Sequence, residues 1–159
     1  MKIAKVMTPL PIQTCQAETR LNEATRLLWD HDCGVLPVVN EEERVIGTIT
    51  DRDICMAAYT TNRPMSELVV NEAMAHEVFT CKPTDDVGRA MKIMQAQKIR
   101  RLPVIDDEER VVGLLSMNDL ARHARSGGSV SSQQLADTLA AICEPRSRVE
   151  VSPPELVTA

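Results

Sequence analysis

The sequence predicts a mixed α/β fold of the α+β type, in which two β-α-β-β-α repeats pack against each other and a further helix follows. The main observation is an internal repeat: residues 35–54 (VLPVVNEEERVIGTITDRDI) recur without a gap as residues 101–120 (RLPVIDDEERVVGLLSMNDL). Pro37 aligns with Pro103, and 9 of the 20 aligned positions are identical, so the two segments are copies of one unit. A second observation is that a unit of this size cannot bury its apolar face alone.

The first copy, repeat one, is assigned to residues 5–60 and begins with an extended piece at residues 11–14. Apolar residues at three- and four-residue spacing predict a helix over residues 20–32. Thr19 is the expected N-cap of this helix, because a hydroxyl oxygen can accept a hydrogen bond from a free backbone N–H. Gly34 stands where a helix commonly ends in the left-handed conformation.

A hairpin and a second helix complete each repeat. Short β-branched runs on either side of an acidic turn predict the hairpins, and a hydroxyl residue opens the helix after each hairpin, Thr50 in repeat one and Ser116 in repeat two. Repeat two, assigned to residues 71–125, has its extended piece at residues 78–80 and a first helix that ends near residue 98. The predicted hairpin strands are residues 36–39, 45–49, 102–105 and 111–115.

The C-terminal part of the chain differs from both repeats. Residues 126–129 (SGGS) form a flexible break. A narrow apolar stripe then predicts a C-terminal helix, assigned to residues 130–144, which needs a docking surface to be stable. The last segment, residues 145–159, shows no periodicity and is expected to be loose.

The composition excludes several classes of protein. The net charge of −5 and the small number of aromatic residues argue against nucleic acid as the main ligand. No apolar run reaches the roughly 18 residues that span a bilayer, and the first residues carry no signal-peptide core. Five cysteines without close pairing indicate reduced thiols. We therefore expect a cytoplasmic protein that does not enter a membrane.

One sequence order, L-P-V, acidic turn and G-h-h-[TS]-x-x-D, where h is an apolar residue or threonine, occurs twice in register. This order resembles the paired cystathionine-β-synthase-type (CBS) domain, also called the Bateman module, and the resemblance covers about residues 5–125. It implies two repeats packed sheet to sheet with pseudo-twofold symmetry, and two clefts that bind adenosine-containing ligands such as AMP, ADP, ATP or S-adenosylmethionine. It also implies a stand-alone regulatory role rather than a catalytic one.

Two hydroxyl–carboxylate pairs, Thr50 with Asp53 and Ser116 with Asp119, are the central candidates for ligand binding. Each pair has the spacing of a helix cap, which is the alternative explanation, but a capping box prefers the longer Glu or Gln at its third position. An aspartate is well suited to accept two hydrogen bonds from a ribose diol. The resemblance assigns this ribose role to Asp53 and Asp119, with Thr50 and Ser116 beside them.

Cations that could bind phosphate are distributed unequally between the two expected sites. The resemblance sets Arg100 and Arg101 of repeat two against the site of Asp53, whereas the site of Asp119 has only Arg52. The site of Asp53 should therefore favour a phosphorylated adenosine, and the other site should bind the same ligand more weakly or accept a less charged one. The alternative is that Arg100 and Arg101 are ordinary exposed charges.

Adenine requires a flat apolar slot with a few backbone groups at its edge. The candidate contacts are Thr14 and Thr80 at the ends of the first strands, and Val35, Pro37 and Pro103 at the L-P-V segments. Most of the neighbouring aliphatic side chains would belong to the core in any case.

Cys15 and Cys81 also occupy equivalent positions in the two repeats, which raises the hypothesis of a thiol-based redox enzyme. The histidines form no metal-binding set with either cysteine, and the sequence contains neither a nucleophile–base constellation nor a glycine-rich phosphate loop. Small buried apolar side chains are the preferred interpretation of these cysteines. The sequence therefore predicts no enzyme, no metal and no obligatory cofactor.

The leading hypothesis is an adenine-nucleotide sensor whose repeats change their angle when ligand binds, and whose altered surface is read by an unknown regulated protein. The alternative is a structural adaptor without a ligand, in which dimerisation is the whole function. A homodimer is expected, because some apolar helix residues exceed what the boundary between the repeats can cover. These residues are Leu27, Leu28, Met56, Met91, Met94 and Leu120.

Overall fold

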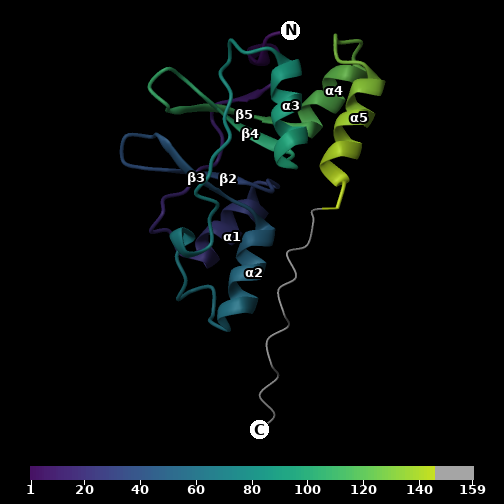
Figure 1. Cartoon of the computed structure of the whole chain (residues 1–159). Helices are drawn as coiled ribbons and strands as arrows, with labels where there is room; N and C mark the ends of the chain where they lie inside the picture. The colour runs from purple at the N-terminus through teal and green to yellow at the C-terminus, as the bar shows by residue number, and fades with distance from the viewer. Residues whose placement is uncertain (146–159) are drawn as a thin grey trace.

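Each repeat forms one half of the molecule, with repeat one at the bottom of Figure 1 and repeat two at the top. The structure, a computed structural model, describes residues 1–145, so the expected loose segment lies outside the described residues from position 146 onward. Within these residues, every helix is too short or too polar to span a lipid bilayer.

The predicted α+β class is confirmed. Repeat one contains α1 (Leu21–Asp30), β2 (Leu36–Val39), β3 (Val45–Ile49) and α2 (Asp51–Thr61), and repeat two contains α3 (Val87–Gln97), β4 (Arg101–Ile105), β5 (Val111–Ser116) and α4 (Met117–Arg125).

The two hairpins have the same register. Leu36 lies opposite Ile49 in the β2–β3 pair, and Leu102 lies opposite Leu115 in the β4–β5 pair. All four of these side chains are fully buried. Burying one such side chain contributes about 1.5–3 kcal/mol, so the hairpins form the centre of each core.

The turns of the hairpins join the two repeats. The backbone N–H of Val45 donates to the carbonyl of Glu109 at 3.2 Å, and that of Val111 donates to the carbonyl of Glu43 at 3.2 Å. Glu43 and Glu109 have φ angles of 62° and 66°, left-handed values that close tight turns. Because the same contact is made in both directions, a pseudo-twofold axis relates the repeats at these turns.

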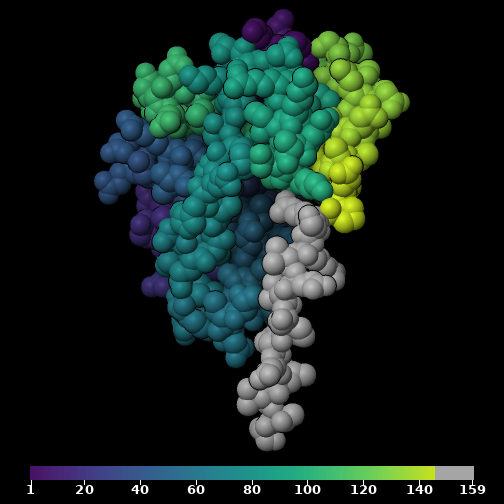
Figure 2. All heavy atoms as spheres, viewed as in Figure 1, coloured from purple at the N-terminus to yellow at the C-terminus, as the bar shows by residue number. Residues whose placement is uncertain are grey.

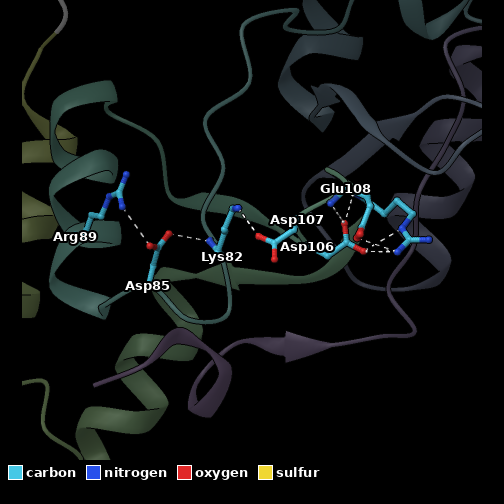
Figure 3. A network of polar contacts seen from close by, with 7 residues as sticks. Lys82, Asp85, Arg89, Asp106, Asp107 and Glu108 are labelled. Atoms are coloured by element: carbon cyan, nitrogen blue, oxygen red, sulfur yellow. Dashed lines mark hydrogen bonds and ion pairs between the residues drawn. The ribbon is translucent and has the colours of Figure 1, made fainter.

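A surface network connects the β4–β5 turn to the start of α3 (Figure 3). Nζ of Lys82 donates to Asp107 Oδ1 at 2.6 Å, and the backbone N–H of Lys82 donates to Asp85 Oδ2 at 2.9 Å. Arg89 of α3 pairs with the second oxygen of Asp85 at 3.2 Å. Exposed ion pairs add little to the free energy of unfolding, so this network contributes little to the stability of repeat two.

The first residues of the chain pack on repeat two rather than on repeat one (Figure 1). η1 (Ile3–Lys5) places the side chain of Ile3, which is fully buried, in the repeat-two core. β1 (Thr8–Pro9) then pairs antiparallel with β5, with Thr8 opposite Leu114. The N-terminal segment is therefore a structural part of the second core.

The segment that precedes repeat two makes the reciprocal crossing. η2 (Val70–Glu72) places Val70, also fully buried, in the repeat-one core. Ala75 and Thr48 of β3 then exchange both backbone hydrogen bonds, at 2.9 and 3.1 Å. Each core is thus completed by a segment that precedes the other repeat, so neither hairpin and its helices form a complete core without that segment.

Two glycines allow these crossing segments to approach the hairpins. A Cβ on Gly113 would lie 2.6 Å from the carbonyl oxygen of Thr8, and a Cβ on Gly47 would lie 2.7 Å from Sδ of Met74 and 3.1 Å from the carbonyl of Ala75. Real Cβ atoms essentially never come within 3.0 Å of such atoms. The glycine of each G-h-h-[TS]-x-x-D segment is therefore explained by packing alone.

The ends of α1 differ from the sequence-based expectation. No side chain caps its start, where Arg20 is the N-cap residue, and the hydroxyl of Thr19 instead accepts the backbone N–H of Gln16 at 3.1 Å. The left-handed residue that follows the helix is Asp32, with φ 47°, and not Gly34. Both expectations were wrong because the helix is shorter at both ends than the apolar spacing indicated.

The C-terminal helix, α5 (Ser132–Cys143), packs on α3 and α4 along the flank of repeat two (Figures 1 and 2). Its Ile142 is buried in the repeat-two core, and Nε2 of Gln95 on α3 donates to the hydroxyl of Thr138 at 2.7 Å. In the part of the chain that the structure describes, repeat one has no corresponding helix over α1 and α2. The two repeats therefore differ in how far their helices are covered.

The helices of repeat one keep an exposed apolar surface. Trp29 is 85% exposed, Tyr59 is 80% exposed and Met56 is 47% exposed. Four of the six apolar residues expected on the surface are instead buried in the protomer cores, because they face their own hairpin. These four are Leu28, Met91, Met94 and Leu120.

Candidate functional site

The first candidate site, the repeat-one motif, consists of Thr50 and Asp53 where β3 leads into α2. Oδ2 of Asp53 accepts the backbone N–H of Thr50 at 2.9 Å and its hydroxyl at 2.6 Å, and the backbone N–H of Asp53 donates to the Thr50 hydroxyl at 3.3 Å. The other carboxylate oxygen, Oδ1, makes no hydrogen bond or ion pair with any of residues 1–145. The Asp53 side chain is half-buried. One carboxylate oxygen is therefore available to a ligand.

The second candidate site, the repeat-two motif, consists of Ser116 and Asp119 where β5 leads into α4. Oδ2 of Asp119 accepts the backbone N–H of Ser116 at 2.8 Å and its hydroxyl at 2.5 Å. Oδ1 accepts the Thr8 hydroxyl at 3.2 Å and forms an ion pair with Arg122. Asp119 is only 5% exposed, so this carboxylate is both buried and fully paired.

Both motifs are reciprocal helix caps. In each, the hydroxyl accepts a backbone N–H and the aspartate accepts the backbone N–H of the hydroxyl residue. The expectation that an aspartate is too short for this position is wrong, since the carboxylate reaches the backbone N–H at 2.9 Å in repeat one and 2.8 Å in repeat two. Capping therefore accounts for one oxygen of each aspartate, and a second role depends on the other oxygen.

Arg101 crosses from repeat two to repeat one. Its guanidinium lies against Gly34, where a Cβ would be 2.8 Å from Nη2. Gly34 stands just before β2, and Thr50 directly follows β3. Since Leu36 lies opposite Ile49, Arg101 and the repeat-one motif share one end of the β2–β3 hairpin.

The other two candidate arginines lie elsewhere. Nη2 of Arg100 contacts Sγ of Cys143 on α5 at 3.7 Å, so this exposed side chain points toward the C-terminal helix. Arg52 is exposed in the first turn of α2, and its guanidinium makes no hydrogen bond or ion pair with the described residues. Of the three arginines, only Arg101 is half-buried at the boundary between the repeats.

The expected adenine contacts are placed beside the hairpins. The backbone N–H of Cys15, directly after Thr14, donates to the carbonyl of Pro37 at 3.1 Å, and that of Cys81, directly after Thr80, donates to the carbonyl of Pro103 at 3.1 Å. Both threonines are half-buried. The remaining candidates are buried among the core residues: Val35, Pro37 and Pro103.

A pocket of about 370 Å³ lies on the outer face of α3, and its lining contains no residue of the two motifs. It is lined by Phe79, Thr80, Arg89, Lys92 and neighbouring residues of α3. Thr80 is the only predicted site residue in this lining. Sequence reasoning missed the pocket, although the single phenylalanine of the chain beside the strand end was a usable signal.

The paired cysteines are buried thiols. Cys15 is 6% exposed and Cys81 is 4% exposed, and burial raises the pKa of each thiol from 9.0 to about 12. Thiols with such a pKa stay protonated and are poor nucleophiles. Among residues 1–145, no three His, Cys, Asp or Glu side chains come together as metal ligands. These observations oppose a thiol-based redox site.

Two parts of the chain match a known domain family. Residues 3–59 and residues 70–126 each match the CBS domain. The CBS domain-containing protein YhcV of Bacillus subtilis is 34% identical over 128 residues, which cover 80% of this chain and 85% of YhcV. The uncharacterized protein MK0525 of Methanopyrus kandleri is 32% identical over 91 residues, 57% of this chain, and this chain spans about half of its length (46%).

A solved structure supports the same assignment. The CBS domain pair of protein MJ0100, solved in complex with 5′-methylthioadenosine and S-adenosyl-L-methionine, superimposes with a TM-score of 0.72 at 27% sequence identity. The match covers 80% of this chain and 98% of that one. The two matched segments coincide with the repeat that is visible in the sequence and with the pseudo-twofold relation of the hairpins. This chain therefore belongs to the CBS domain family and carries two CBS domains in tandem.

Proposed function

We propose that this chain is a regulatory module that binds an adenosine-containing nucleotide at the boundary between its two CBS domains. Binding changes the conformation or the assembly of the module, and an unidentified protein reads that change. The observation that carries the proposal is the open Oδ1 of Asp53 at the same hairpin end as the half-buried guanidinium of Arg101. A carboxylate oxygen can accept hydrogen bonds from a ribose diol, and a guanidinium can bind phosphate.

The residues of the repeat-one motif receive separate roles in this proposal. Asp53 binds the ribose hydroxyls with Thr50 beside it, and Arg101 binds a phosphate group. Thr14, Val35 and Pro37 form the adenine slot. The equivalent residues of repeat two are Thr80, Pro103, Ser116 and Asp119, with Arg52 as the only expected cation, and any binding there is weaker.

The nucleotide class follows from the same chemistry. AMP, ADP and ATP offer the phosphate that a guanidinium at this position would bind. S-adenosylmethionine shares the adenosine but has no phosphate, so it would rely on the adenine and ribose contacts. Support for an adenosine ligand comes from the MJ0100 domain pair, which was solved with two adenosine derivatives.

We infer a homodimer that forms through the helices of repeat one. Trp29 and Tyr59 are mostly exposed, whereas α5 covers the equivalent helices of repeat two. Gln95, which contacts α5, is the repeat-two equivalent of Trp29, so Trp29 occupies the position that a covering helix would contact. This surface also favours the second candidate function, a structural adaptor that acts by dimerisation alone.

A regulatory module in a reducing compartment is consistent with the cysteines. All five are unpaired, and the two at equivalent positions are buried and protonated. We therefore propose a cytoplasmic location for the protein and assign it no catalytic role.

Thermal unfolding in the presence of a nucleotide panel tests the proposed function. A ligand at 100 times its Kd should stabilise the folded chain by about 2.7 kcal/mol, which raises the melting temperature measurably. Adenosine, AMP, ADP, ATP and S-adenosylmethionine form the panel, with GMP as the matched control for a purine nucleotide of different base. If none of the adenosine compounds shifts the transition of a folded sample, the adaptor function is favoured and the nucleotide-binding function is rejected.

A further inference from the structure

The carboxylate of Asp119 has no free hydrogen-bond position. An ionised carboxylate offers about four acceptor positions, two on each oxygen. Both positions of Oδ2 are taken by the backbone N–H and the hydroxyl of Ser116, at 2.8 and 2.5 Å. Oδ1 accepts the Thr8 hydroxyl at 3.2 Å and pairs with the guanidinium of Arg122. The side chain is 4% exposed, so water does not compete for it.

The equivalent carboxylate of Asp53 is only half used. Its Oδ2 accepts the same two groups from Thr50, at 2.9 and 2.6 Å, while Oδ1 is without a partner among the described residues. Met56 takes the place of Arg122 in the alignment that pairs Asp53 with Asp119. Ala75 takes the place of Thr8, because Thr8 lies opposite Leu114 of β5 and Ala75 lies opposite the equivalent Thr48 of β3. Neither a methionine nor an alanine side chain has a hydrogen-bond donor, so repeat one cannot fill Oδ1 in the way that repeat two does.

We propose that Thr8 and Arg122 close the repeat-two motif to a nucleotide ribose, so that each chain binds one nucleotide, at the repeat-one motif. This inference rests on the proposed function. A ribose diol must donate its hydrogen bonds to an open carboxylate oxygen. At Asp119 it would have to displace a charged guanidinium from a buried oxygen, whereas at Asp53 it meets an oxygen that is already open.

The closure also depends on the N-terminal segment. Thr8 belongs to β1, which pairs with β5 directly before the repeat-two motif. Its hydroxyl therefore reaches Asp119 only while this segment is docked on repeat two. Arg122 is three residues further along α4 than Asp119, and its side chain is 74% exposed, so it can turn toward solvent once the pair is broken.

Calorimetric titration with AMP and with adenosine tests the inference on four forms of the chain. The wild type should bind one molecule per chain. The double variant Thr8→Val, Arg122→Met, which copies the donor-free surroundings of Asp53, should bind two. Met56→Arg, which places a guanidinium beside Asp53, should weaken the repeat-one site by about tenfold or more. Arg125→Met removes an exposed arginine one turn beyond Arg122 and should leave the stoichiometry at one.

The outcomes separate the closure of the repeat-two motif from nucleotide binding at the repeat-one motif. Two sites of similar affinity in the wild type, or one site in both the wild type and a double variant that is folded by circular dichroism, would overturn the inference. If the wild type binds no nucleotide and the double variant binds one, the closure holds while the proposed function at the repeat-one motif fails. If neither form binds AMP or adenosine, both are wrong. An unchanged affinity in Met56→Arg would show that a guanidinium at this position does not close a motif.

Discussion

The guanidinium of Arg101 occupies the space beside Gly34, with Nη2 2.8 Å from where a Cβ on that glycine would lie. The two residues belong to different repeats, so this contact carries a positive charge from repeat two to the hairpin end of repeat one. The positive charge of Arg101 also affects the neighbouring Cys33 thiol. Burial raises the pKa of this thiol above its usual value, whereas the charge of Arg101 acts to lower it. A residue at position 34 with a side chain would push the guanidinium away.

This contact predicts a specific change in ligand preference. Arg101→Ala should weaken AMP by about tenfold or more and adenosine much less, because a guanidinium that binds phosphate contributes nothing to the nucleoside. Calorimetric titration of the variant and the wild type with both ligands measures the two ratios. Arg100→Ala is the matched control, since its guanidinium contacts Cys143, and it should leave both affinities near the wild-type values. Equal losses for AMP and adenosine in Arg101→Ala would contradict the phosphate role.

Gly113 and Gly47, which the two crossing segments approach, should differ in how well they tolerate a methyl group. Gly113→Ala brings Cβ within 2.6 Å of a backbone carbonyl, which cannot move without disturbing the β1–β5 pairing. Overpacking of this kind costs about 1–3 kcal/mol of unfolding free energy. Gly47→Ala meets first the thioether of Met74, a flexible side chain, and should cost less. Urea unfolding of both variants gives the comparison, and a larger loss in Gly47→Ala would show that the carbonyl contact is not the limiting one.

The buried thiols predict that the chain loses stability in base. Cys15 and Cys81 have a pKa of about 12 in the fold, against 9.0 without burial. The unfolded thiols lose their protons first as the pH rises, so the stabilising effect is complete below pH 9 and disappears between about pH 9 and 12. The slope in this window is about 1.4 kcal/mol per pH unit for each fully buried thiol.

The double variant Cys15→Ala, Cys81→Ala separates this effect from other titrations. It should lose about 1–3 kcal/mol at neutral pH through packing, and its stability should fall less steeply above pH 9 than that of the wild type. Urea unfolding at pH 7, 9 and 10 provides the slopes. Parallel slopes in both proteins would mean that these thiols do not set the base sensitivity.

The sequence predicted the parts of the fold that depend on repetition. The hairpin strands, the helix openings at Thr50 and Ser116 and the helix before Cys143 follow from local periodicity and capping chemistry, which act within a few residues. The crossing of the N-terminal segment to repeat two could not be predicted in this way. Ile3 is an ordinary apolar residue in the sequence, and only the three-dimensional packing shows which core it fills.

Only the local part of the candidate site could be predicted, because contacts between distant residues leave no pattern in the sequence. The spacing of each hydroxyl–carboxylate pair raised capping as an alternative, because both groups lie in one turn of helix, although the short aspartate side chain was expected to disfavour it. The difference between the two aspartates depends on Thr8, which is 111 residues from Asp119 in the chain. The exposure of Trp29 likewise depends on which helices α5 covers. Long-range contacts of this kind leave no local pattern in a single sequence.

The exposed aromatic surface predicts how the protein assembles. Trp29→Ser with Tyr59→Ser should convert a dimer into a monomer, since large aromatic residues contribute most of the binding energy at such surfaces. Light scattering at micromolar concentration measures the mass. Leu139→Ser is the matched control, because Leu139 is 46% exposed on α5, outside the proposed interface. A wild-type chain that is already a monomer would contradict the proposed dimer.

The two aspartates should separate binding from stability. Asp53→Ala removes one cap from α2 and should cost about 1 kcal/mol of unfolding free energy, while it weakens AMP binding by about tenfold or more because the open oxygen is lost. Asp119→Ala removes a buried group that accepts four hydrogen bonds and should cost about 2 kcal/mol or more, yet leave AMP affinity at the repeat-one motif unaltered. Both changes delete the same residue type at equivalent positions, so each is the control for the other. Urea unfolding and calorimetric titration with AMP measure the two quantities on the same samples.

If Asp119→Ala abolished AMP binding while Asp53→Ala did nothing, the roles of the two motifs would be exchanged. If neither change altered the affinity, both aspartates would be helix caps only, and the nucleotide would have to bind elsewhere.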